Sequence, residues 1–234
     1  MALGRPRLHL RVVDSTNTRA RALAADGAPH GTLVTASEQT AGRGRQGRTW
    51  SAPPGRALLM SLVLRSPPPL LALVAGVAVC DAVTAVAPDA RPQLKWPNDV
   101  LLVGRKLAGI LVEGRPQEDW AVLGIGVNVA VRAEDLPVEL RERAATLGLA
   151  PAEIETVLAG LLCALERWLV EPAGAQLDAW RSRDALRGRE VAWSGGRGRA
   201  EGLDEGGRLL VAVGDEGERV ALEAGEVHLA GDGA

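Results

Sequence analysis

Residues 95–113, KWPNDVLLVGRKLAGILVE, constrain the fold more strongly than any other stretch of the chain. Two apolar segments, residues 100–103 and 106–113, flank a tight turn at Gly104. Apolar runs separated by a short glycine-containing turn are typical of a β-hairpin. The stretch therefore predicts two adjacent antiparallel strands, and any fold for this chain must include them.

The same hairpin carries an unusual choice of basic residues. The chain has 27 lysines and arginines, and only Lys95 and Lys106 are lysines. An ammonium is a compact charge on a flexible stem, whereas a guanidinium is a broad planar fork, so the two differ at a tight site. Strand alternation places Lys106 on one face with Ala108 and Ile110, and Gly109 on the other. We interpret both lysines as lining one site, although Lys95 could instead pack beside its neighbour in sequence.

Composition limits the broad class of protein. A chain of 234 residues favours one main domain with an appendage, and its net charge of -2 gives no reason to expect nucleic-acid binding. The N-terminus lacks a signal peptide, and the longest apolar run, residues 70–80, is too short to span a bilayer. We therefore expect a cytoplasmic protein without a membrane partner. The Cys and His residues lack metal-ligand spacing, and Cys80 and Cys163 are expected to be buried free thiols.

Hydrophobic patterning predicts an α+β fold in which helices pack on a mixed sheet. Further strands are expected over residues 8–12, 32–37, 57–64, 92–96 and 120–130. Helices are expected over residues 18–25, 70–86, 154–169 and 177–185.

The C-terminal part of the chain has a different character. Short apolar segments at residues 191–193, 209–213, 219–222 and 227–230 alternate with turns rich in Gly, Asp and Glu. This pattern favours a small SH3-like β-barrel. We expect a catalytic domain at residues 1–186 and the barrel at residues 187–234.

A second unusual segment is the glycine- and arginine-rich stretch at residues 38–50. Its glycines match G-x-G-x-x-G, but prolines soon follow where a dinucleotide-binding fold needs a helix, and no G-K-[ST] ending is present. What remains is a loop in which Arg43, Arg45 and Arg48 could pair with phosphate or carboxylate. A solvated basic loop is the alternative interpretation.

A cluster of small polar residues follows the first expected strand. Asp14 and Ser15 could cap the next helix, but capping explains one polar residue and not the four of Asp14-Ser15-Thr16-Asn17. Hydroxyls and an amide at a helix start could also bind a polar ligand.

Four motifs, taken in order, resemble those of the biotin protein ligases. They are DSTN at residues 14–17, the run at residues 39–50, KWPND with GRKLAG, and GIGVN at residues 124–128. The resemblance covers the whole chain and implies a class II synthetase-like catalytic domain followed by the small barrel. Because the first motif begins at residue 14, it implies a monofunctional form without an N-terminal DNA-binding domain and without a nucleic-acid partner. A homodimer is left open.

The resemblance also implies a two-step reaction. Biotin and ATP form biotinyl-5′-adenylate and pyrophosphate, and biotin then passes to a lysine of the carboxyl-carrier domain of a biotin-dependent carboxylase. Mg²⁺ is expected to arrive with ATP and not in a protein metal site.

By similarity, several residues take roles in that reaction. Biotin binding is assigned to Ser15, Thr16, Asn17, Gln39, Arg43, Gly44, Arg45, Lys106 and Gly109. ATP binding is assigned to Arg43, Arg45, Arg48, Trp50, Lys95, Asn98 and Asn128. The catalytic residues are Lys106, Arg45 and Asp99. Asp99 would orient or deprotonate the acceptor amine, although it could equally cap the turn after Pro97.

Three other functions would make different demands on the sequence. A lipoate or octanoate ligase or transferase of similar fold would need a pocket for an alkyl chain without partners for a ureido ring. A non-catalytic biotin-binding protein would not need both lysines and the basic loop. An interaction protein built on the barrel is disfavoured because Trp193 is the only aromatic residue there.

Overall fold

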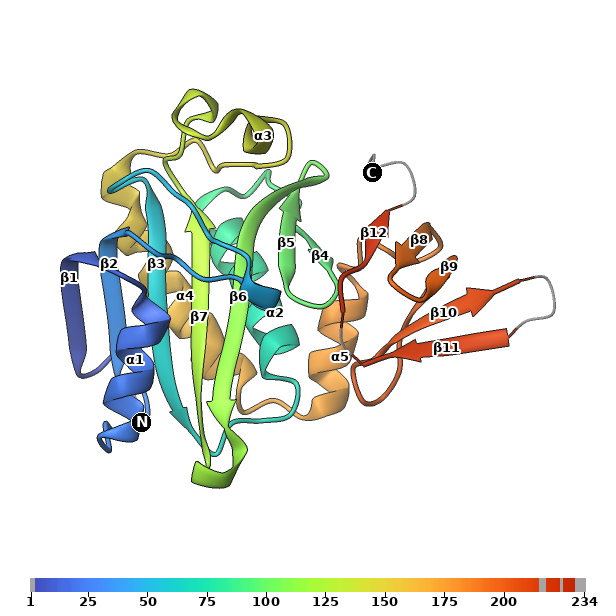
Figure 1. Ribbon diagram of the computed structural model, residues 1–234, viewed down its shortest axis with the longest axis horizontal. Coiled ribbons are helices and arrows are strands. Elements are labelled where there is room, and N and C mark those ends of the chain that lie inside the picture. Colours follow the sequence, from blue (N-terminus) through green and yellow to red (C-terminus); the bar gives the residue numbers. More distant parts are fainter. Residues whose placement is uncertain (1–2, 215–217, 224, 230–234) are drawn as a thin grey trace.

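The computed structural model describes residues 3–214, 218–223 and 225–229. Within the first range, only the backbone of Arg115 and Pro116 is described. Figure 1 shows a central sheet with helices on both faces and a second, smaller sheet that follows it in the chain. The central sheet has seven strands in the order β1-β2-β3-β7-β6-β5-β4. Strands β1 and β2 are parallel and the other neighbours are antiparallel, so the sheet is mixed.

The strands of the central sheet match the expected apolar segments closely. They are β1 Arg7–Val13, β2 Leu33–Gln39, β3 Ala57–Arg65, β4 Gln93–Lys95, β5 Asp99–Leu102, β6 Arg105–Arg115 and β7 Trp120–Asn128. The helices are α1 Thr16–Ala25, α2 Leu71–Val86, α3 Val138–Arg141, α4 Ile154–Trp168 and α5 Ala173–Arg181. The predicted helix at residues 177–185 thus begins and ends earlier.

The two faces of the central sheet are covered differently. Helices α2 and α4 pack on one face and bury the main hydrophobic core, while α1 lies on the other (Figure 1). On the α1 face, a small cluster around Val34 and Val63 lies under α1, and a second around Leu59 and Val131 lies under the 130–144 segment. Between these clusters the sheet carries Ser61 and glycines, so this part of the face lacks large apolar side chains. That strip holds the candidate site.

The C-terminal unit is a five-stranded antiparallel sheet in the order β11-β10-β9-β8-β12. Its strands are β8 Glu190–Trp193, β9 Gly196–Leu203, β10 Leu209–Val213, β11 Glu218–Leu222 and β12 His228–Leu229. The sequence analysis missed β9, because its segment GRGRAEGL has little apolar character. The last predicted residue of β12, Ala230, lies outside the described residues.

The small sheet packs directly against the larger unit. Trp96 Nε1 donates a hydrogen bond to the carbonyl oxygen of Gly207 at 3.0 Å, and buried residues of the small sheet, such as Val191 and Leu209, join the main core. The α+β class with a separate small β unit is confirmed. The division between residues 186 and 187 stays a prediction.

The two cysteines differ in their environments. Cys80 on α2 is buried, and burial raises the pKa of its thiol to about 12. Cys163 on α4 is exposed, so the expectation that it is buried was wrong. Its helix has a strongly amphipathic pattern, but Cys163 falls on the solvent side. Within the described residues, no helix has the length and apolar character needed to cross a membrane.

Candidate functional site

The floor of the candidate site is a glycine strip on β6 and β7. Gly109 pairs with Gly126, and Gly124 lies two residues before Gly126 on β7. A Cβ added to Gly126 would lie 2.5 Å from Trp50 Cε2, and one added to Gly124 would lie 2.0 Å from Asn17 Oδ1. Both positions therefore require glycine, because other parts of the chain approach the backbone closely.

A buried network of neutral side chains forms one end of the strip. Gln39 Oε1 accepts hydrogen bonds from the backbone N–H of Thr16 at 2.7 Å and from its hydroxyl at 3.0 Å. The Ser61 hydroxyl lies 2.8 Å from Thr16 Oγ1 and 2.6 Å from Asn17 Oδ1. Ser15, at the start of α1, is also buried. The structure thus brings together Ser15, Thr16, Asn17 and Gln39, as the sequence analysis expected.

Glu113 on β6 connects this network to the glycine-rich loop. Its Oε2 accepts a hydrogen bond from Asn17 Nδ2 at 2.9 Å, and its Oε1 lies 2.7 Å from Arg43 Nη2. Arg21 Nη1 lies 3.4 Å from the same Oε1. Arg43 is therefore held next to the polar cluster.

Lys106 lies at the other end of the strip. Its Nζ forms an ion pair with Asp99 Oδ1 at 2.7 Å and lies 5.8 Å from the centre of the Trp50 ring. A Cβ added to Gly109 would lie 3.2 Å from Lys106 Cε, so Lys106 and Gly109 share a face.

This placement corrects the alternation predicted for β6. Leu101 pairs with Lys106 but Val100 pairs with Ala108, so β6 has an extra residue, Leu107, at a bulge. A bulge reverses the alternation of faces beyond it. Lys106 therefore faces the glycine strip, and Ala108 faces the core.

The loop at residues 40–56 closes over the Lys106 end. Arg45 Nη1 donates a hydrogen bond to Asn98 Oδ1 at 3.0 Å, and Asn98 Nδ2 donates to the carbonyl oxygen of Ile110 at 2.9 Å. Partial burial lowers the pKa of Arg45, while the nearby Asp99 acts in the opposite direction. Trp50 Nε1 is buried and has no hydrogen-bond partner among the described residues. Arg45, Asn98, Asp99 and Lys106 thus lie close together, and Lys106 lies beside the Trp50 ring.

The remaining predicted site residues have other surroundings. Arg48 forms an ion pair with Glu226, which belongs to the C-terminal unit. Asn128 is buried at the end of β7 and donates through Nδ2 to the carbonyl oxygen of Ala145 at 2.9 Å. The Gly44 N–H donates to the carbonyl oxygen of Arg48 at 2.7 Å. Lys95 lies opposite Asp99 in the β4–β5 pairing.

The sequence analysis missed two residues of the site, Ser61 and Glu113. A serine inside the apolar run of β3 was the available signal for Ser61, because a buried hydroxyl needs a partner. Glu113 had no such signal, since a carboxylate near a strand end usually faces solvent.

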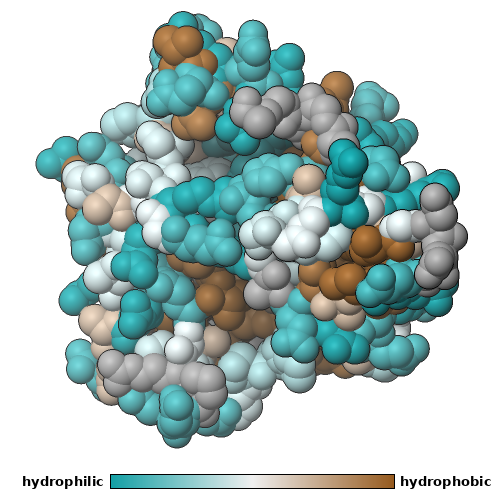
Figure 2. Space-filling view, turned by 45° about the vertical axis from the view of Figure 1, so that its right-hand side comes forward, coloured by the Kyte–Doolittle hydropathy of each residue, from teal (hydrophilic) through white to brown (hydrophobic). Residues whose placement is uncertain are grey.

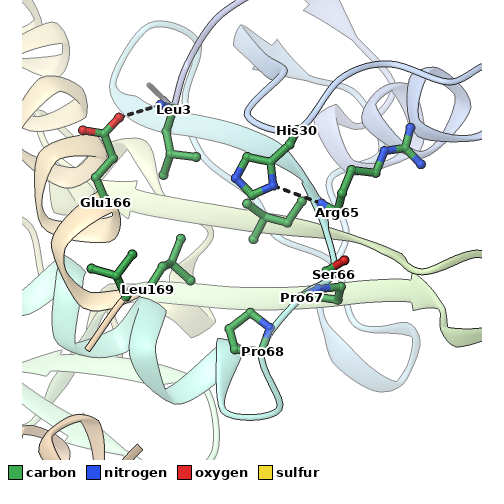
Figure 3. Close-up of a pocket in the computed structure, with 10 residues that line it drawn as sticks. Leu3, His30, Arg65, Ser66, Pro67, Pro68, Glu166 and Leu169 are labelled. Carbon is green, nitrogen blue, oxygen red and sulfur yellow. Dashed lines mark hydrogen bonds between the residues drawn. The ribbon is translucent and has the colours of Figure 1, made fainter. Parts of the chain in front are cut away.

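A separate cavity of about 550 Å³ lies away from this strip, near the end of β3 and the end of α4 (Figure 3). Its lining contains no predicted site residue, and its polar groups already have partners. Glu166 Oε1 accepts from the N–H of Leu3 at 2.5 Å, and His30 Nδ1 accepts from the N–H of Arg65 at 3.2 Å. We therefore assign no function to this cavity.

Figure 2 shows a mostly hydrophilic surface on which hydrophobic residues gather in a hollow near the middle of the face and in a patch beside it. No group of three or more potential metal ligands occurs among the described residues.

Fold and site together define an α+β domain whose glycine strip has neutral polar groups at one end and cations at the other. The Biotin/lipoate A/B protein ligase family matches residues 9–129. Because this match spans more than half of the chain, the chain belongs to the Biotin/lipoate A/B protein ligase family.

Individual relatives support the assignment. The chain is 38% identical over 233 residues to a biotin--[acetyl-CoA-carboxylase] ligase of Mycobacterium tuberculosis, covering 92% of this chain and 86% of that one. It is 42% identical over 159 residues to the bifunctional ligase/repressor BirA of Bacillus spizizenii, covering 64% of this chain and 49% of that one. The chain thus spans about half the length of this relative.

Among solved structures, the biotin protein ligase from Aquifex aeolicus in complex with biotin and ATP is similar throughout. The TM-score is 0.80 at 30% identity, and the match covers 97% of this chain and 99% of that one.

Proposed function

We propose that the chain is a biotin protein ligase. It activates biotin with ATP to biotinyl-5′-adenylate and transfers biotin to a lysine of a carboxyl-carrier domain. The observation that carries the proposal is the polarity of the glycine strip, with a buried hydroxyl and amide network at one end and Lys106 with Arg45 at the other. Biotin has the same polarity, because a neutral ureido ring and a carboxylate lie at opposite ends of the molecule.

The neutral end suits the ureido ring. A ureido group offers two N–H donors and one carbonyl acceptor, and Ser15, Thr16, Asn17 and Gln39 supply hydroxyl and amide partners of both kinds. The polar side chains are fixed by one another and by Ser61, so little conformational entropy is lost when the ring binds. Gly124 allows the Asn17 side chain to lie close to the backbone of β7, which places the Asn17 amide in this network.

The cationic end suits the first chemical step. The biotin carboxylate attacks the α-phosphorus of ATP, and pyrophosphate leaves with the electrons of the broken P–O bond. Lys106 and Arg45, together with Arg43 on the adjoining loop, supply positive charge where negative charge builds up in the transition state. Gly109 allows Lys106 and Trp50 to lie close to the backbone of β6, and Gly44 allows a tight contact with Arg48 within the loop. Mg²⁺ would enter with ATP and be held mainly by its phosphates.

The nucleotide would lie over Trp50, between the loop and the end of β7. Asn128, Asn98, Arg48 and Lys95 would line the rest of that space. Asn128 Oδ1 is buried without a hydrogen-bond partner among the described residues, as is Trp50 Nε1. Buried polar atoms without a partner favour a polar ligand beside them, because leaving them unpaired is costly.

In the second step the acceptor lysine attacks the acyl carbonyl and AMP leaves. The attacking amine must lose a proton, and Asp99 is the carboxylate next to Lys106 that could orient or accept it. Asp99→Asn tests this role when adenylate formation and transfer from preformed adenylate are assayed separately. Selective loss of transfer supports it, and equal loss in both steps contradicts it.

The decisive experiment is incubation of the protein with biotin, ATP, Mg²⁺ and a purified carboxyl-carrier domain. We expect pyrophosphate release and a mass increase of one biotinyl group on the acceptor. Lipoate and octanoate in place of biotin test the alternative within the same family, and acceptor modification by either at a rate equal to that of biotin would overturn the proposal. Pyrophosphate release separates an enzyme from a binding protein.

We also propose that the acceptor is the carboxyl-carrier domain of a biotin-dependent carboxylase, that the protein is cytoplasmic and that it has no nucleic-acid partner.

A further inference from the structure

We infer that Glu113 is a positioning residue that connects the neutral end of the site to the glycine-rich loop through one carboxylate, an inference that rests on the proposed function. It fixes the amide of Asn17 in one orientation and anchors Arg43 of the glycine-rich loop beside it. The carboxylate reaches the two groups through different oxygens, Oε2 for Asn17 and Oε1 for Arg43.

The orientation of the Asn17 amide follows from what a carboxylate can do. An ionised carboxylate only accepts hydrogen bonds, so the Nδ2 group of Asn17 must face Glu113. Oδ1 of Asn17 then faces Ser61, whose hydroxyl can donate to it at 2.6 Å. Asn17 thus cannot exchange its donor and acceptor ends, and the pattern offered to a bound ring is fixed.

The contact with Arg43 has a different consequence. Arg43 belongs to the glycine-rich loop, and its guanidinium meets Glu113 at 2.7 Å. The side chain of Glu113 is only 18% exposed, so this ion pair is screened less than a pair on the open surface. Arg21 of α1 approaches the same oxygen at 3.4 Å, which places a second cation beside it.

A glutamine cannot replace Glu113 in both contacts. If its amide oxygen faces Asn17, its NH₂ group faces a guanidinium that has no acceptor to offer. If the amide is reversed, two NH₂ groups face each other at the Asn17 side. Glu113→Gln therefore keeps the shape of the side chain but loses one contact, whereas Glu113→Ala loses both.

The test uses two readouts on the full chain. The KM for biotin in pyrophosphate release reports on the Asn17 end. Limited trypsin digestion without ligands, with the cleavage sites mapped by mass spectrometry, reports on the loop at residues 43–48. For Glu113→Ala we expect the KM for biotin to rise about tenfold and cleavage in the loop to accelerate about tenfold. Glu113→Gln should change at least one of these readouts by a similar factor.

A double mutant tests whether Glu113 acts through Asn17. We expect Asn17→Ala with Glu113→Ala to raise the KM for biotin no further than Asn17→Ala alone, because the two residues share one contact. Additive effects would overturn the inference. Glu155→Ala is the matched control, since Glu155 on α4 also pairs with an arginine at 2.7 Å, Arg7 on β1, but lies away from the site.

The outcomes separate the two proposals. Wild-type values for both readouts in both Glu113 variants would overturn the positioning role. If the wild-type protein released no pyrophosphate, the proposed function would fail, and the loop digestion would still test the contact with Arg43. Thermal unfolding shows whether each variant is folded. If Glu113→Ala does not fold, the readouts for Glu113→Gln alone test the positioning role.

Discussion

The two ends of the site are built on opposite physical principles. At the neutral end, Ser15, Thr16, Asn17 and Ser61 are at most 4% exposed, and Ser61 forms hydrogen bonds with Thr16 and Asn17. At the cationic end, the side chain of Lys106 is 37% exposed and pairs with Asp99, and on the adjoining loop the side chain of Arg43 is 46% exposed and pairs with Glu113. A buried polar group must be paired within the protein, whereas a half-exposed ion is also stabilised by water.

This difference suggests how the two ends divide their work. A rigid, fully bonded network is suited to recognising a shape and a hydrogen-bond pattern. Cations on a hairpin and a loop can leave their carboxylate partners when a more negative ligand arrives. We therefore expect mutations at the neutral end to change affinity and stability, and mutations at the cationic end to change rate.

The largest effect is expected for Lys106→Met. Loss of the ammonium should slow pyrophosphate release about 10²- to 10³-fold, because a fixed cation near the transferring phosphoryl group is removed. The affinity for biotin, measured by calorimetry, should fall by no more than about tenfold. Lys106→Arg should not restore the rate, since a planar fork does not fit where a compact charge did. An equal loss of affinity and rate would contradict the division between the two ends.

The next largest effect is expected for Gly124→Ala. The new methyl group would lie 2.0 Å from Asn17 Oδ1, so Asn17 must move. The KM for biotin should rise about tenfold or more, while the KM for ATP changes little. Gly174→Ala on α5 is the control, because its Cβ would meet nothing within 4 Å. An unchanged KM for biotin would argue against Asn17 as a biotin contact.

A smaller effect on stability is expected for Ser61→Ala. Its hydroxyl is fully buried and bridges Thr16 and Asn17, so its removal leaves a buried acceptor without a donor. The free energy of unfolding, measured in urea, should fall by about 1–3 kcal/mol. Ser182→Ala, which removes an exposed hydroxyl, should change it by less than about 0.5 kcal/mol. Equal effects of the two substitutions would show that the network is not tightly bonded.

The smallest effect is expected for Glu226→Gln, which removes the ion pair between the C-terminal unit and Arg48. Both side chains are substantially exposed, so the free energy of unfolding should change by less than about 1 kcal/mol. The difference from wild type should shrink further in about 1 M salt, because the charges are screened. A larger loss of unfolding free energy that persists in salt would show that this exposed ion pair stabilises the fold as strongly as a buried contact does.

Much of the fold was predictable because it depends on local patterns. Continuous apolar runs predicted the buried strands β3 and β7. An apolar residue every three to four positions predicted α4, because a helix with one buried face shows this period. Strand β9 was not predictable in this way. Its arginines and glycines carry no apolar pattern, and only pairing with β8 and β10 makes it a strand.

The sequence by itself determined which side chains could serve an anionic and a polar neutral ligand, because rare lysines, clustered arginines and a polar tetrad are visible without coordinates. Only the tertiary structure decided how they meet. The bulge at Leu107 turned Lys106 to the glycine strip, and Glu113 joined Asn17 to Arg43 across 96 and 70 residues of chain. Register and long-range pairing depend on packing between distant segments, which local patterns do not specify.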